Sequence, residues 1–258
     1  MSETSEALNT PKTDRLENLR TLRVANLDGA FATAFATLIG GSFIIGYIKT
    51  EIPDGRADHW LGLISALPGF LGLIQIPGAI WGRSYPSYKS FIRIPAAIYR
   101  FLHLPLAFLP LLALNTDVKL AIIVGCVSLA AAVINIVNPI YSDWLAEMVP
   151  ETSRGAFYAN RNSIMMAVGA SVGLLGGLLV DFLKRQHQAN YGYGLIFSLA
   201  LIFAFASWFF FSKMQDIPRE EPVKQNLKEG IKAFAGPFRD KNFQKVLMCA
   251  IGKAHPVT

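Results

Sequence analysis

Charged and polar side chains inside otherwise apolar stretches are the residues of this chain whose types and positions could do chemistry. Arg100 interrupts one such stretch, His103 follows it one helical turn later, and Asp28 stands at the start of another. Such side chains are costly in apolar surroundings, so they are candidates for binding a solute or coupling an ion. The amides Gln75 and Asn135, also in apolar stretches, could hydrogen-bond a solute and extend the candidate set.

Six long stretches with few charges hold these residues and make up most of the chain. Of the 258 residues, only 16% are charged, whereas a soluble domain carries about 25%. A helix of roughly 20 apolar residues crosses about 30 Å of hydrocarbon. We therefore predict an all-α membrane protein, a six-transmembrane-helix bundle, rather than the buried core helices of a soluble domain. The predicted spans are 29–48, 60–82, 94–114, 120–142, 163–180 and 191–212.

Each candidate residue also has a simpler interpretation. Arg100 is near enough to the end of its span for its long side chain to reach the membrane surface. His103 fits a hydrogen-bonded packing role as well as it fits proton coupling. The two amides could bridge neighbouring helices, as such residues more often do. If Arg100 faces inward instead, Asp28, Asp143 or Glu147 could supply its counter-charge.

The charges between the spans predict the orientation and the domain organisation. Of the 24 Lys and Arg residues, the first, third and fifth connections hold only Lys49, Arg56, Lys119, Lys184 and Arg185. The positive-inside rule then places both termini in the cytoplasm. We expect a cytoplasmic N-terminal segment with an amphipathic lead-in at 1–27 and the six-span bundle at 28–212. A cytoplasmic loop at 213–245 and the truncated start of a seventh span at 246–258 follow.

A dense polar strip, SDWLAEMVPETSRGAFYANRNSI at 142–164, links the fourth and fifth predicted spans. Helical spacing puts Asp143 and Glu147 on one face, and Arg154 and Arg161 on one face of the next helix. Acids and arginines that meet at the cytoplasmic surface could form a gate, holding two helix ends together in one conformation and releasing them in another. The alternative is a set of ordinary interfacial charges, because exposed ion pairs contribute only about 0–1 kcal/mol.

The polar strip and the span after it resemble a known family. The strip resembles the connection that leads into the fifth helix of major facilitator superfamily transporters, with a Pro followed by Arg-Gly. The matching residues are Pro150, Arg154 and Gly155. The fifth span is similar to the family's glycine motif, although it lacks the Pro. Gly169, Gly173 and Gly177 recur every four residues, and such a stripe lets another helix approach closely.

The connection after the second span, GAIWGRSYPSYKSFIR, is similar to a third motif of the family. Gly78 fits the motif, and Arg83 and Lys89 supply its basic charge. Gly82 stands where the family usually has an Asp that forms a gating pair. The resemblance adds Arg83 and Lys89 to the cytoplasmic gate candidates of the polar strip.

The resemblance implies both a fold and a function. The fold would be two inverted three-helix repeats, the N-terminal half of a major facilitator superfamily (MFS) transporter. The function would be secondary active transport of a small solute by alternating access. The implied partners are the lipid bilayer, a small-molecule substrate of unknown identity and a C-terminal six-helix half, and a coupling ion stays open. Nothing in the sequence indicates a cofactor, a metal site or nucleic-acid binding. The expected location is the plasma (inner) membrane.

Two other functions stay open at this point. The apolar run VLMCAIG is too short to cross a bilayer, so the chain could be a nonfunctional fragment of a transporter. A six-span intramembrane enzyme would need a nucleophile and a base within hydrogen-bond reach. The chain has no G-x-S-x-G, no H-E-x-x-H and no intramembrane pair of aspartates. We therefore predict that the chain is not an enzyme.

Overall fold

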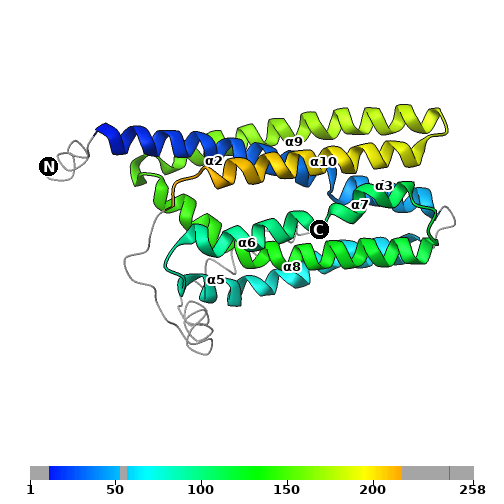
Figure 1. The fold of residues 1–258 in the computed structure, drawn as a ribbon, viewed down its shortest axis with the longest axis horizontal. Coiled ribbons are helices and arrows are strands. Elements are labelled where there is room, and N and C mark those ends of the chain that lie inside the picture. The colour runs from blue at the N-terminus through cyan, green and yellow to red at the C-terminus, as the bar shows by residue number, and fades with distance from the viewer. Residues whose placement is uncertain (1–11, 53–56, 217–243, 245–258) are drawn as a thin grey trace.

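The computed structural model describes residues 12–52, 57–216 and 244 of the chain, and these form long helices that lie side by side (Figure 1). Within them there is no β-strand. Six helical spans are long and apolar enough to cross a membrane, which confirms the predicted all-α membrane fold. They are Arg20–Glu51, Asp58–Arg83, Tyr88–Leu111, Thr116–Met148, Glu151–Arg185 and Ala189–Ser212.

The first three spans are each made of shorter pieces. Span 1 consists of α2 (Lys12–Leu38) and α3 (Gly41–Glu51). Span 2 consists of α4 (Ala57–Leu71), the 3-10 turn η1 (Gly72–Ile74) and α5 (Gln75–Arg83). Span 3 consists of α6 (Tyr88–Phe101), α7 (Leu104–Phe108) and the 3-10 turn η2 (Leu109–Leu111).

Glycine and proline account for breaks in spans 1 and 3. Between α2 and α3, a Cβ on Gly40 would lie 2.5 Å from the carbonyl oxygen of Ala36, so this bend requires a glycine. In span 3, Pro105 stands in the first turn of α7 and Pro110 in η2. Proline lacks the N–H that would continue the hydrogen-bond ladder of the preceding helix, so a continuous helix cannot pass through these positions undisturbed.

The last three spans are continuous helices. They are α8 (Thr116–Met148), α9 (Arg154–Arg185) and α10 (Ala189–Ser212), and the short turn η3 (Glu151–Ser153) precedes α9. The side chain of Asn115 caps α8 by accepting a hydrogen bond from the N–H of Asp117. Because α8 and α9 extend beyond the predicted apolar limits, most of the polar strip at 142–164 is helical.

The spans pack in two groups of three. In the first group, α2 lies against α9 and α10; in the second, α8 lies against α4, α5 and α6 (Figure 1). Helix α10 also contacts α6 and α7 and so joins the groups. Each group takes spans from both halves of the chain: span 1 packs with spans 5 and 6, and span 4 with spans 2 and 3. If span 1 is exchanged with span 4, span 2 with span 5 and span 3 with span 6, one group becomes the other.

Two apolar clusters fill the interior of the bundle. The larger one includes Phe35, Tyr47, Leu106, Tyr193 and Phe197. The smaller one, toward the end of the bundle where α10 finishes, includes Ala25, Phe91, Ile92, Trp144 and Phe211. Trp144 is fully buried, so it is a core residue.

Several predicted boundaries involve residues that the structure describes only in part. Helix α2 runs without a break from the predicted lead-in into span 1, and Thr21 and Ala25 on it are buried. Residues 1–11 lie outside the described residues. So do the predicted loop at 213–245, apart from 213–216 and 244, and the predicted start of a seventh span at 246–258.

The contact between α5 and α8 yields a test of the packing. A Cβ on Gly78 would lie 2.7 Å from both the Cα and the carbonyl oxygen of Ile136, and backbone atoms cannot move aside as a side chain can. We expect Gly78→Ala to lower stability by about 1–3 kcal/mol, the usual cost of overpacking. The measurement is the thermal unfolding midpoint of the purified chain in detergent. Gly62→Ala, in the same span with no atom within 4 Å, is the matched control. Equal midpoints for the two variants would contradict this packing.

Candidate functional site

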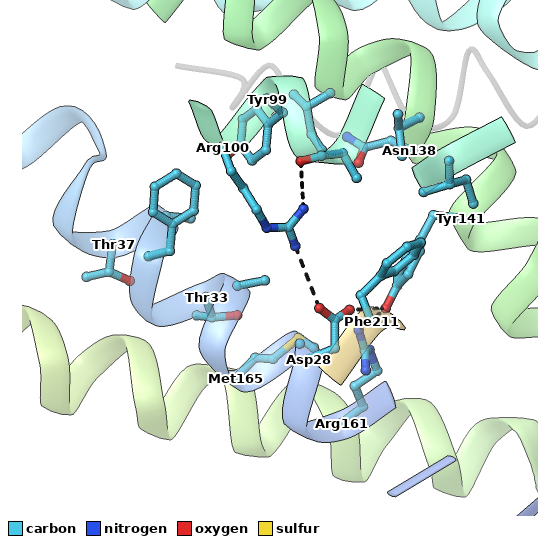
Figure 2. A pocket seen from close by; sticks show the side chains of 18 residues that line it. Asp28, Thr33, Thr37, Tyr99, Arg100, Asn138, Tyr141, Arg161, Met165 and Phe211 are labelled. Carbon is cyan, nitrogen blue, oxygen red and sulfur yellow. Dashed lines mark hydrogen bonds and ion pairs between the residues drawn. The ribbon is translucent and has the colours of Figure 1, made fainter. Parts of the chain in front are cut away.

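A buried carboxylate, that of Asp28 on α2, lies between the two apolar clusters and is the centre of a polar network (Figure 2). Its Oδ1 atom accepts a hydrogen bond of 2.7 Å from the Ser207 hydroxyl on α10. Its Oδ2 atom accepts one of 2.9 Å from the Tyr141 hydroxyl on α8. These bonds supply the partners that a buried carboxylate needs in place of water.

Arg100 on α6 provides the counter-charge of Asp28. Its Nη2 atom lies 3.7 Å from the carboxylate and donates a hydrogen bond of 2.5 Å to Ser207. Its other nitrogens donate to the carbonyl oxygens of Ala204, at 3.1 Å, and Ala96, at 2.9 Å. The side chain is therefore turned into the bundle and does not extend to the membrane surface. Of the counter-charges that the sequence left open, Asp28 is the one within ion-pair distance.

Arg161 on α9 reaches the same network from another side. The guanidinium donates to the carbonyl oxygen of Ala25 and, over 3.1 Å, to the Tyr141 hydroxyl. Tyr141 thus joins Arg161 to Asp28. Gly29 leaves room for this arrangement, because a Cβ there would lie 2.6 Å from Nη2 of Arg161 and would overlap the Met165 methyl group. The sequence assigned Arg161 to the cytoplasmic gate, but the structure places its side chain in the buried network.

The break in span 3 explains what His103 does. The N–H of His103 bonds to the carbonyl of Arg100, three residues back, so it does not bond to the carbonyl of Tyr99. The ring Nδ1 of His103 forms a hydrogen bond of 2.8 Å with the Tyr99 carbonyl instead. Because a carbonyl only accepts, Nδ1 carries the hydrogen. The ring also packs edge-on against Phe35 and Tyr99, an arrangement that corresponds to the packing interpretation of His103.

A cavity of about 510 Å³ adjoins the network (Figure 2). Its polar lining includes Asp28, Thr33, Thr37, Arg100, Asn138, Tyr141 and Arg161. Its apolar lining includes Phe35, Ile92, Ile134, Val137, Met165 and Phe211. These residues come from α2, α6, α8, α9 and α10, so both groups of spans contribute to the cavity. Such a volume suits a small molecule, and the charged groups lie at its wall.

The two amide candidates lie together but bridge helices. Gln75 donates a hydrogen bond of 2.7 Å to the side-chain oxygen of Asn135, and Asn135 donates one of 2.8 Å to the carbonyl of Ala131. Span 2 is thereby joined to α8 where η1 gives way to α5. Neither amide is among the residues that line the cavity. Their contribution to solute binding stays a prediction.

The predicted acid–arginine contacts of the polar strip are not found among the described residues. Asp143 and Glu147 are exposed, and neither forms an ion pair or hydrogen bond with Arg154 or Arg161. Arg154 instead bonds to Glu151, at 3.2 Å, and to the last carbonyls of α8. The reason is that α8 continues to Met148 and η3 turns the chain, so Arg161 lies two turns inside α9, away from these acids.

Lys89, another gate candidate, ties α6 to α10. Its ammonium group donates to the carbonyls of Ser212 and Met214, at 2.8 and 2.7 Å. In return, Asp216 accepts hydrogen bonds from the N–H of Lys89 and, at 2.6 Å, from the Ser87 hydroxyl. Each helix end thus receives the charge that stabilises it. The remaining gate candidate, Arg83, is exposed in the last turn of α5.

The predicted glycine stripe of α9 is only partly engaged. Gly169 and Gly173 face α2. A Cβ added to Gly169 would lie 3.5 Å from the side chains of Thr33 and Thr37, and one added to Gly173 would lie 3.4 Å from that of Thr37. For Gly177 nothing lies within 4 Å. The closest approach is instead at Gly176, where a Cβ would lie 2.8 Å from the Phe43 ring. The family motif has an Asp in place of Gly82, and a Cβ at Gly82 would overlap the Ile140 side chain.

The chain matches no protein-family model, no curated protein and no solved structure. The fold and the site therefore rest on the residues and their geometry.

The network contains two residues that the sequence did not single out, Tyr141 and Ser207. Ser207 lies in an apolar span, where a serine side chain often hydrogen-bonds its own backbone. Tyr141 follows Asn138 by three residues and so shares its helical face, which is a weak signal. Ser207 carries no signal of its own, because its importance comes from the position of α10 beside α2.

A double-mutant cycle tests the Asp28–Arg100 pair. We expect Arg100→Met to cost about 3–5 kcal/mol, because it leaves a buried carboxylate without its counter-charge. Combining it with Asp28→Asn should recover part of that loss in the thermal unfolding midpoint. Glu151→Gln, which breaks the exposed pair with Arg154, is the control and should cost about 0–1 kcal/mol. Strictly additive losses in the double variant would show that the two groups do not interact.

Proposed function

We propose that this chain forms the N-terminal six-helix half of an MFS-type secondary active transporter, which moves a small solute by alternating access. The observation that carries the proposal is the buried network of Asp28, Arg100, Tyr141 and Arg161, which lies at the wall of a cavity of about 510 Å³ inside six apolar spans. Charged groups in membrane spans are costly, and they mark the paths of ions and solutes.

The form of the helices supports the same proposal. In secondary transporters, discontinuous helices line the solute site, and repeats of the fold pack across one another. Here Arg100 lies just before the break of span 3, on the cavity wall. The first three spans and the last three also occupy equivalent places in the two groups, as two repeats of one fold would. In the proposed transporter, the cavity supplies this half's share of a site that faces the partner half.

The proposed location is the plasma (inner) membrane. The proposed orientation puts both termini in the cytoplasm. The positive charges of the connections support it. The network then lies in the cytoplasmic half of the bilayer, since Tyr141 and Arg161 are each about two turns from the helix ends that lie on the side of the N-terminus.

Uptake by the source cells tests the function. Deleting the gene should abolish saturable uptake of at least one compound in a panel of radiolabelled small solutes. Restoring the wild-type gene at its own locus should recover that uptake, whatever the full length of the product. Arg100→Ala should not recover it, although the protein should still be present in the membrane fraction. If the deletion leaves every uptake rate unchanged, the proposal fails.

A second variant separates the cavity from protein stability. Asn138 lines the cavity and makes no hydrogen bond with a described residue, so Asn138→Ala should leave the fold intact. We expect this variant to lower uptake at least several-fold by removing a group that faces the solute. The matched control is Asn162→Ala, an exposed asparagine on α9 that does not line the cavity. Equal uptake by the two variants would remove the cavity from the transport path.

A further inference from the structure

The charges at the cavity do not balance. Among the 18 residues that line it, one carries a negative charge, Asp28, and two carry positive charges, Arg100 and Arg161. The tyrosines of the lining are neutral near pH 7. The cavity wall therefore carries an excess of one positive charge, and the question is which arginine holds it.

Arg100 and Asp28 satisfy each other. Both carboxylate oxygens of Asp28 have partners, Oδ1 in Ser207 and Arg100, and Oδ2 in Tyr141. The guanidinium of Arg100 is bonded through Nε, Nη1 and Nη2 to protein groups. A solute could use these atoms only by replacing contacts that already exist. The pair holds helices α2, α6 and α10 together, and its net charge is zero.

Arg161 holds the excess charge. Its bonds go only to neutral acceptors, which are a backbone carbonyl, the Tyr141 hydroxyl and, at 3.5 Å, the amide oxygen of Asn26. No carboxylate of the described residues forms an ion pair with it. Yet Arg161 is 7% exposed, so water does little to solvate it. Asp28 acts on it only through the intervening Tyr141 hydroxyl and is already paired with Arg100. A buried cation without an ion-paired partner of its own is unfavourable, and an anion placed beside it lowers that cost.

The rest of the lining limits the kind of anion. Apolar side chains such as Ile134, Met165 and Phe211 form much of the wall, which suits a hydrocarbon body more than a fully hydrated inorganic ion. The hydroxyls of Thr33 and Thr37 make no hydrogen bond with a described residue and remain available to a solute. One excess positive charge matches one negative charge.

We propose that the cavity binds a small organic monoanion of the carboxylate class, with its carboxylate against Arg161 and its apolar part against the α8 and α10 walls. This inference rests on the proposed transport function for its biological meaning, but the binding itself does not depend on transport. In this arrangement Arg161 is the solute-binding charge, and Arg100 is the charge that keeps Asp28 in place.

Three probes of matched shape and different charge test the inference: butyrate, butyramide and butylammonium. The measurement is the thermal unfolding midpoint of the purified full chain in nanodiscs, followed by tryptophan fluorescence at constant ionic strength. Butyrate should raise the midpoint in a saturable way, and the neutral and cationic probes should not. Arg161→Gln should lose the butyrate effect. Arg154→Gln, which removes a half-exposed cation outside the cavity from the same helix, should keep it.

Several results would overturn the inference. These are no shift with butyrate, equal shifts with all three probes, a preference for butylammonium, or an unchanged butyrate effect in Arg161→Gln. If Arg161→Gln does not fold, Gly29→Ala replaces it, because the added Cβ displaces the Met165 methyl group and the tip of Arg161 and leaves the charge in the protein. That variant should weaken butyrate binding at least several-fold, and unchanged binding would overturn the assignment to Arg161.

The binding and uptake experiments distinguish failure of the anion site from failure of the transport function. Saturable butyrate binding in a chain whose deletion changes no uptake rate would leave the anion site standing and remove the transport function. Loss of uptake confined to neutral or cationic solutes would leave the transport function standing and overturn the anion site.

Discussion

The structure depends first on the protein groups that take the place of water around one buried carboxylate, that of Asp28. A buried carboxylate is stable only where partners replace its hydration, and here these come from three other spans. Arg100 brings α6, Tyr141 brings α8, and Ser207 brings α10 to the same point on α2. Lipid tails compete equally for apolar helix surfaces, so polar contacts of this kind help to decide which helices pack together inside a membrane.

The apolar parts of the bundle are arranged around that network. One cluster fills the interior on one side of it and the second fills the other side, so the charged groups lie between two layers of packed side chains. The break in span 3 falls beside the same point. His103 gives a partner to the Tyr99 carbonyl, which the backbone leaves free where α6 ends at Phe101.

The sequence predicted the fold far better than the site, for a physical reason. Runs of apolar residues report membrane spans directly, and all six were found, although the first and fifth begin at Arg20 and Glu151 and not at the predicted 29 and 163. It also singled out Asp28 and Arg100, since a charge inside such a run is conspicuous. It could not tell that Ser207 faces Asp28 or that Arg161 turns inward, because these facts depend on how α9 and α10 pack against α2. The acids of the polar strip were placed by helical spacing alone, and the turn at η3 separated them from Arg161.

Lys89 and Asp216 each bind the end of the helix from which the other comes, and this reciprocal contact has a consequence for how α6 and α10 move. The ammonium of Lys89 holds the last carbonyls of α10, and the carboxylate of Asp216 holds the first turn of α6. The chain leaving α10 is therefore fastened to the start of span 3 and not to its own helix alone. A displacement of Asp216 would therefore act on the first turn of α6, the helix that carries Arg100. The surface contact with Asp216 and the buried ion pair with Asp28 thus belong to one short helix.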